Sequence, residues 1–198
     1  NLNQLGQLVL KQSTDADNLK GVAYNYTLYA KVEDIDRQVI QGTQSAVVHP
    51  ASFYIGARFS GTNSYFVKKG ERINVETVFT RPNGDLYNLK KSKKMNVKLY
   101  RITWKVAQQQ GVYNRVNTRY EKVEELESEF DISVKGNLNR FNLATQKSGR
   151  YKLVFECKDE KDRTALTEFY FYSTGSDWVV WGSEGANDIT LYADKPVY

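Results

Sequence analysis

Apolar and polar residues alternate along most of the chain with a period of two, which places one face of a strand against a core. The clearest run occupies even positions from Val22 to Val32 and includes Tyr24, Tyr26 and Leu28. The same alternation recurs in residues 73–79, 95–99, 130–134, 151–157 and 165–171. Turn-like segments such as 82–85 and 158–162 separate these runs, and no long stretch keeps a helical stripe. We therefore predict an all-β fold built from immunoglobulin-like antiparallel β-sandwiches.

A weak internal repeat divides the chain. The alternating residues Tyr26, Leu28, Ala30, Val32 and Asp34 match Tyr151, Leu153, Phe155, Cys157 and Asp159, 125 residues later. Asp36-Arg37 follows the first copy and Asp162-Arg163 follows the second, and another strand comes after each. Because this spacing is about the length of one sandwich domain, we predict three parts. Residues 1–50 are the closing strands of one sandwich, 51–175 form a complete sandwich, and 176–198 form a connector and the first strand of a third.

Length and composition exclude several classes of protein. The 198 residues suffice for one domain or two small ones. No apolar run reaches the roughly 18 residues of a membrane span. With one cysteine and one histidine, an internal disulfide framework, a multi-thiolate zinc site and a His-rich metal site are excluded. The chain lacks an initiator Met and a charged-then-apolar leader. We therefore expect it to be a piece of a longer protein.

His49 and Cys157 are the first candidates for chemistry. His49 precedes Pro50 at the end of an apolar strand, and no nearby residue is indicated as a nucleophile or as an orienting carboxylate. We interpret it as a structural imidazole that is hydrogen-bonded to backbone at a domain junction. Cys157 lies on the inward-facing set with Leu153 and Phe155. A buried thiol behaves as a small hydrophobe, and we expect Cys157 to be inert.

Charged clusters offer three further candidates. Asp15-Ala16-Asp17-Asn18 and Asp159-Glu160-Lys161-Asp162 lack the spacing of a calcium loop, so we interpret both as acidic turns. Residues 51–110 carry 12 Lys and Arg against 3 Asp and Glu. The densest group is Lys90, Lys91, Lys93 and Lys94, with Arg101 and Lys105 beyond it. Basic and aromatic residues do not interleave there on one face as nucleic-acid binding by β-folds requires. We therefore predict a solvated strand face and no nucleic-acid partner.

Two tryptophans leave a second function open. Trp178 and Trp181 lie near Gly182 and Gly185 in the predicted connector. We expect them to pack against a neighbouring module, and the alternative is a platform for carbohydrate. The chain would then be an extracytoplasmic immunoglobulin-like module that binds carbohydrate or a cell-surface ligand.

One stretch resembles a known family. The sequence His49-Pro50-Ala51-Ser52-Phe53-Tyr54-Ile55-Gly56 follows a strand that continues as Val32-Glu33-Asp34-Ile35-Asp36-Arg37-Gln38. Together they resemble a junction in bacterial alpha-2-macroglobulin family proteins, where one macroglobulin domain closes with V-x-D-x-x-R-Q and the next opens with H-P-A-S-x-Y-x-G. Residues 66–71, 81–85, 148–153 and 189–198 contain phrases that agree with this reading. The resemblance covers almost the whole chain.

The resemblance implies a scaffold segment of a broad-spectrum protease inhibitor. In this family a protease cleaves a bait region, the molecule rearranges, and a thioester can bind the attacker covalently. Cys157 is followed by Lys158-Asp159-Glu160, which does not match the thioester motif Cys-x-Glu-Gln. We therefore expect no catalytic, cofactor-binding or metal-binding residue, no cofactor and no enzymatic activity in this chain.

The resemblance also implies partners and a location. The expected partners are neighbouring macroglobulin domains of the same chain and, through the full-length protein, target proteases. The expected location is extracytoplasmic, in the periplasm or on the outer surface. A lipid anchor outside residues 1–198 would then provide the only membrane contact, as in a lipoprotein. His49-Pro50 would be a hinge, and residues 176–198 would lead to the bait-bearing domain.

Overall fold

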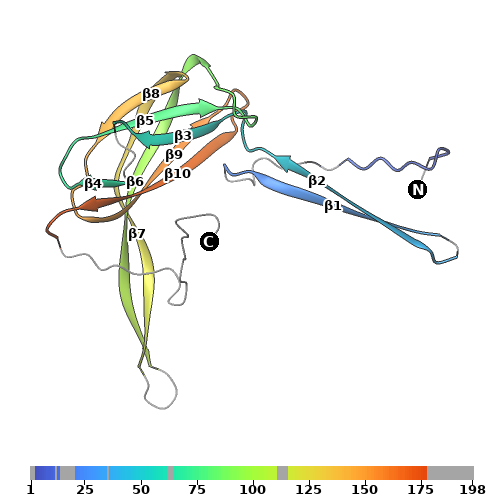
Figure 1. The fold of residues 1–198 in the computed structure, drawn as a ribbon, viewed down its shortest axis with the longest axis horizontal. Helices are drawn as coiled ribbons and strands as arrows, with labels where there is room; N and C mark the ends of the chain where they lie inside the picture. Colours follow the sequence, from blue (N-terminus) through green and yellow to red (C-terminus); the bar gives the residue numbers. More distant parts are fainter. Residues whose placement is uncertain are drawn as a thin grey trace, which may run out of the picture.

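The computed structural model describes residues 3–11, 13, 21–34, 36–61, 65–110 and 116–177, with side chains up to Lys105 and from Glu121 onward in the hairpin that spans 89–136. The described residues contain no helix and ten strands, so the all-β prediction is confirmed (Figure 1). The strands are β1 (Tyr24–Glu33), β2 (Val39–Val48), β3 (Tyr54–Phe59), β4 (Phe66–Lys68), β5 (Ile73–Thr80), β6 (Leu89–Gln110), β7 (Val116–Gly136), β8 (Leu138–Leu143), β9 (Gly149–Lys158) and β10 (Thr164–Thr174).

Strands β3 to β10 form a sandwich of two sheets. One sheet has five strands in the order β4-β10-β9-β6-β7, and the other has three in the order β3-β5-β8. All pairings are antiparallel except that of β4 with β10, which is parallel over three residues. The Thr167 hydroxyl of β10 donates to the Ile55 carbonyl of β3 at 2.8 Å and so links the two sheets.

The core lies between these sheets and is rich in aromatic side chains. Many residues of the alternating runs are buried there, including Ile73, Val75, Phe79, Tyr151, Leu153 and Phe155. Phe130, Ile132 and Phe169 of the same runs are only partly buried and pack against this core. Phe53 packs edge-to-face on Phe79 with ring centroids 5.1 Å apart, a favoured geometry for aromatic pairs. The Tyr151 hydroxyl donates to the Lys147 carbonyl at 2.9 Å. A tyrosine bonded back to the preceding backbone in this way is a hallmark of immunoglobulin-like sandwiches.

Strands β6 and β7 extend beyond the sandwich as a long hairpin (Figure 1). Pairing of β6 with β9 ends at Ile102, whereas pairing of β6 with β7 continues to Gln110. The β6–β7 register shifts between Leu99 and Tyr100 and again between Leu89 and Lys93. Such irregularities increase the local twist and redirect side chains.

The internal repeat is visible in the backbone. Strands β1 and β9 have equal length and begin 125 residues apart, as do the starts of β2 and β10. In the turn that connects each pair of strands, the residue two positions before the second strand has a positive φ, which is 61° at Arg37 and 62° at Asp162. The turns are equally long, so Arg37 corresponds to Asp162 and not to Arg163. The Asp36-Arg37 alignment with Asp162-Arg163 was therefore wrong by one residue.

The two hairpins differ in what covers them. Tyr26, Leu28 and Val32 of β1 are exposed, although their equivalents Tyr151, Leu153 and Cys157 are buried. The three-stranded sheet covers β9 and β10, whereas β1 and β2 form a separate two-stranded sheet that projects from the sandwich (Figure 1). The prediction of an inward-facing side for residues 22–32 is therefore not met among the described residues.

Candidate functional site

The link between β2 and β3 carries the predicted junction motif. The His49 ring is half-buried, and its Nδ1 lies 2.6 Å from the Tyr54 hydroxyl. The two rings meet edge-to-face. Burial raises the pKa of the Tyr54 hydroxyl. The hydrogen-bond partner of His49 is therefore the side chain of Tyr54, five residues later in the chain. The prediction that its imidazole bonds to backbone was wrong.

A buried carboxylate fixes the other side of this link. The Asp159 side chain is fully buried and accepts a 3.0 Å hydrogen bond from the Ser52 backbone N–H, 107 residues away. It also accepts bonds from the N–H groups of Lys161 and Arg163 and from the Arg163 guanidinium. Burial by itself would raise the pKa of Asp159, but the bonds from Arg163 and the three N–H groups outweigh it. The pKa consequently lies well below its ordinary value, and the junction contains a permanently charged Asp159.

The remaining motif residues fill close contacts. Pro50 and Ala51 are buried, and Phe53 is fully buried against Phe79 and Tyr87. A Cβ atom on Gly56 would lie 2.9 Å from the Val78 Cγ1 atom of the neighbouring strand. Packing therefore explains the residue type at most positions of the motif. We refer to residues 49–56 together with the turn 159–163 as the junction.

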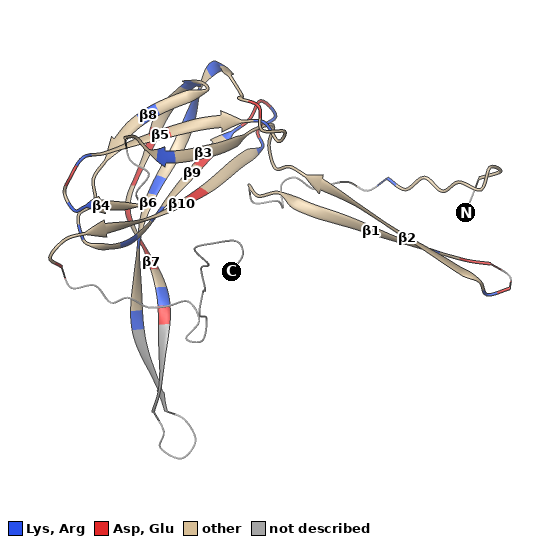
Figure 2. Cartoon of the chain, viewed as in Figure 1, with Lys and Arg blue, Asp and Glu red and all other residues tan. Residues whose placement is uncertain are grey.

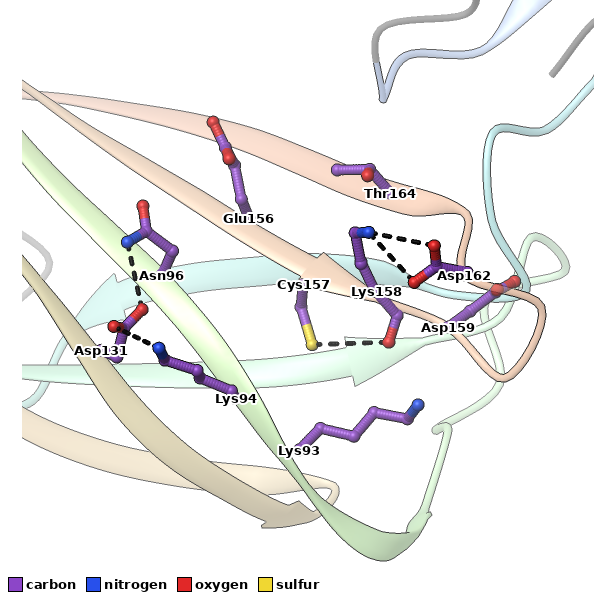
Figure 3. A pocket seen from close by; sticks show the side chains of 10 residues that line it. All are labelled: Lys93, Lys94, Asn96, Asp131, Glu156, Cys157, Lys158, Asp159, Asp162 and Thr164. Atoms are coloured by element: carbon purple, nitrogen blue, oxygen red, sulfur yellow. Dashed lines mark hydrogen bonds and ion pairs between the residues drawn. The ribbon is translucent and has the colours of Figure 1, made fainter. Parts of the chain in front are cut away.

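Cys157 occupies the core, as predicted. Its side chain is buried, and its sulfur lies 3.9 Å from the Lys158 carbonyl (Figure 3). Burial raises the pKa of the thiol to about 11. The thiolate is the nucleophilic form of cysteine, so almost none of it is reactive near neutral pH.

We expect Cys157 to resist a thiol reagent such as 5,5′-dithiobis(2-nitrobenzoate) in the native chain and to react fully in denaturant. Cys157→Ser should lower the free energy of unfolding by about 1–3 kcal/mol, because it puts a hydroxyl in an apolar site. Chemical denaturation measures this loss, and a native labelling rate equal to that of the unfolded chain would contradict the burial of the thiol.

The basic cluster is divided by tertiary pairing. Lys93 lies 3.4 Å from Glu160, and Lys94 lies 2.8 Å from Asp131, which also accepts a bond from Asn96 (Figure 3). Further along β6, the ion pair with Glu156 raises the pKa of Lys98. Acidic residues of β7, β9 and the 159–163 turn thus face the lysines of β6, and Figure 2 shows blue and red segments close together there. Part of the excess positive charge of residues 51–110 is therefore balanced by acidic residues that lie elsewhere in the sequence.

The other candidates separate in space. The Arg101 guanidinium donates to the Ser148 carbonyl, and Lys105 is exposed on the extended hairpin. Among the described residues, no group of three His, Cys, Asp or Glu side chains could hold a metal ion. Asp15, Asp17 and Asn18 lie outside the described residues, as do Trp178, Trp181, Gly182 and Gly185.

Two charged groups on the sheet surfaces were not anticipated. Glu76 of β5 is buried between Arg58 of β3 and Arg140 of β8, with 2.7 Å to each guanidinium. Their hydrogen bonds lower the pKa of Glu76 to about 2. Lys152 of β9 is similarly buried and contacts Glu124 and Glu168. Strand alternation placed these side chains on outer faces, but only the register shows which charges lie opposite one another.

No family model matches the chain. A curated relative, the alpha-2-macroglobulin homolog of Nostoc sp., is 23% identical over 175 residues, which is 87% of this chain and 9% of the relative. Among solved structures, native E. coli alpha-2-macroglobulin superposes with a TM-score of 0.51 at 13% identity, over 77% of this chain and 10% of that protein. Salmonella alpha-2-macroglobulin is also similar, with a TM-score of 0.49 at 13% identity, over 75% of this chain and 10% of that one. The chain therefore spans about a tenth of the length of these proteins.

The fold is that of macroglobulin domains, an all-β class of immunoglobulin-like sandwiches. The sequence match over most of the chain, with the shared fold, supports a resemblance to a segment of the longer bacterial alpha-2-macroglobulins. The family resemblance predicted from the motif at residues 49–56 is thereby confirmed.

Proposed function

We propose that the chain is a non-catalytic scaffold segment of an extracytoplasmic, broad-spectrum protease trap of the alpha-2-macroglobulin type. The observation that carries the proposal is the junction, where a hairpin equivalent to β9–β10 leads through buried contacts into a complete sandwich. Two successive domains that close with the same hairpin are what a tandem array of macroglobulin domains requires. In this reading, target proteases and neighbouring macroglobulin domains are the partners.

The proposed domain division follows the repeat. Residues 1–50 close one macroglobulin-like domain, residues 51–175 form the next, and residues 176–198 lead to a bait-bearing domain. We propose that the exposed apolar side of β1 is covered by the rest of its own domain in the full-length protein. We also propose a periplasmic or outer-surface location, with a lipid anchor outside the chain. Within the part of the chain that the structure describes, no helix has the length and apolar character needed to cross a bilayer.

The interior of the sandwich supports a structural role. A trap that changes shape needs units that are rigid inside and move against one another. The sandwich has a continuous core rich in aromatic side chains, and Gly21, which precedes the β1–β2 hairpin, accepts a 3.3 Å hydrogen bond from the Leu166 N–H. Several polar groups of the junction are bonded to one another, His49 to Tyr54 and Asp159 to Ser52 and Arg163.

The test compares the intact protein that contains this chain with the isolated chain. A protease incubated with the intact protein should keep its activity on a small peptide substrate and lose most of its activity on a large protein substrate. The isolated chain should change neither rate, because it holds no bait region in this proposal. Both rates are measured with the same protease preparation.

Two outcomes would contradict the proposal. If the intact protein leaves cleavage of the large substrate unchanged, the chain does not belong to a protease trap. If the isolated chain binds a carbohydrate on a glycan array, and if Trp178→Ala or Trp181→Ala abolishes that binding, the chain is instead an immunoglobulin-like binding module.

A further inference from the structure

A cleft with a volume of about 550 Å³ opens at the end of the sandwich where β6 begins, beside the junction. Four segments line it: the loop before β6, the first residues of β6, the turn between β9 and β10, and Ser52 of the link between β2 and β3. In Figure 2 this end of the molecule carries blue segments on both the loop and the turn. Five cationic side chains face the cleft, from Arg81, Lys90, Lys91, Lys161 and Arg163. We name this feature the basic cleft.

Most of the positive charge of the basic cleft is not neutralised by the residues that the structure describes. Its two carboxylates are already paired, Asp159 with Arg163 at 2.6 Å and Glu160 with Lys93 at 3.4 Å. By contrast, Arg81, Lys90, Lys91 and Lys161 make no ion pair among the described residues. Four like charges around one concave surface repel one another, so a bound anion would relieve a cost that the folded chain otherwise bears.

An irregular strand register explains why these lysines are unpaired. Between the pairs Leu89↔Gly136 and Lys93↔Val134, three residues of β6 face a single residue of β7. Lys90 and Lys91 therefore leave the regular ladder, in which Lys94 and Lys98 face carboxylates of β7. The bulge directs basic residues to the end of the sheet, where the loop before β6 and the turn between β9 and β10 supply further cations.

The segments that line the basic cleft are held in place. The buried Asp159 fixes the turn 159–163 through its bonds to Lys161, Arg163 and Ser52. The loop before β6 is closed by a 2.7 Å hydrogen bond from the Arg81 N–H to the Asp85 carbonyl. The Arg81 guanidinium lies over the Tyr87 ring, 5.4 Å from its centroid. The cationic groups are thus presented on an ordered frame, which reduces the entropy lost on binding.

We propose that the basic cleft binds a small ligand that carries two or more phosphate groups. Arg and Lys side chains are the preferred partners of phosphate oxygens, and such charge-assisted hydrogen bonds are strong. The volume lies within the range of ligand pockets, and cations from three segments suit more than one phosphate. Base stacking is disfavoured, because the one aromatic ring of the lining, Tyr87, has Arg81 over its face and packs on Phe53. A nucleic-acid strand therefore fits less well than a compact phosphate-bearing ligand.

The test uses isothermal titration calorimetry of sodium tripolyphosphate into the full chain at low ionic strength. Lys90→Gln with Lys91→Gln should weaken binding at least about tenfold, since hydrogen bonds to charged groups contribute more than neutral ones. Lys31→Gln with Lys68→Gln is the matched control. It removes the same charge at exposed positions far from the cleft, where each lysine makes only an exposed ion pair. The control should change the dissociation constant less than about twofold.

A second measurement separates a free phosphate ligand from a lipid headgroup. Vesicles of cardiolipin, which carries two phosphates, and of phosphatidylcholine are sedimented with the parent chain and with both double variants. Binding to cardiolipin that depends on Lys90 and Lys91 would assign the cleft to a lipid headgroup, and binding of tripolyphosphate alone would assign it to a free ligand. If the parent binds neither probe, or if the control loses as much affinity as the cleft variant, the proposal is overturned.

Discussion

Leu153→Ala should lower the free energy of unfolding of the chain by about 2–5 kcal/mol, whereas Leu28→Ala should change it by less than about 0.5 kcal/mol. The two leucines occupy equivalent positions of the internal repeat, 125 residues apart, on strands of equal length. Leu153 is fully buried between the sheets, and Leu28 is 57% exposed. Truncating Leu153 removes buried apolar surface and leaves a cavity, while truncating Leu28 removes contacts mainly with water.

Urea denaturation followed by far-ultraviolet circular dichroism measures both changes, and Leu28→Ala serves as the matched control. Equal losses in the two variants would mean that β1 is packed as tightly as β9 in the isolated chain. That result would contradict the uncovered first hairpin. In the intact protein we expect Leu28→Ala to become costly, because the proposed domain would then cover its side chain.

Asp159→Asn should lower the free energy of unfolding by about 2–4 kcal/mol, because an amide cannot accept all the bonds that this buried carboxylate receives. The Arg163 guanidinium and several N–H groups would lose their charged acceptor. Asp162→Asn is the control in the same turn. Its side chain is exposed, it pairs only with Lys158 at the surface, and asparagine tolerates its positive φ of 62°. The control should lose less than about 1 kcal/mol.

The charged Asp159 should also make the free energy of unfolding depend on pH. The pKa of Asp159 is lower in the folded chain than in the unfolded chain. An unfolded chain then binds more protons in acid, so the contribution of Asp159 is fully present above the ordinary pKa of about 4 and is lost as the pH falls below it. Glu76, with its pKa lowered to about 2, acts in the same direction. Chemical denaturation at pH 7 and at pH 3 should give a smaller difference for Asp159→Asn than for the parent. Identical differences in the two proteins would contradict a charged Asp159 in the folded state.

The sequence by itself determined the fold class and the core. Alternation with a period of two needs only local information, because it shows which face of a strand is apolar whatever the partners of that strand are. The set Ile73, Val75, Phe79, Leu153 and Phe155 was therefore correctly assigned to the interior. The motif at residues 49–56 likewise indicated the family resemblance, although most of its contacts, such as that of Phe53 with Phe79, reach distant parts of the chain.

Tertiary structure alone decided which charges meet and which faces are covered. The hydrogen bond between Asp159 and the Ser52 N–H joins residues that are 107 positions apart. Because almost every residue has a backbone N–H, the sequence does not indicate which one donates. The division of the basic cluster into paired Lys93 and Lys94 and unpaired Lys90 and Lys91 depends on a register shift between β6 and β7. The alternation in β1 is as strong as that in β9, yet only β9 lies under the second sheet. Alternation records which face of a strand is apolar, but burial of that face requires another layer, and the position of a layer is set by long-range packing.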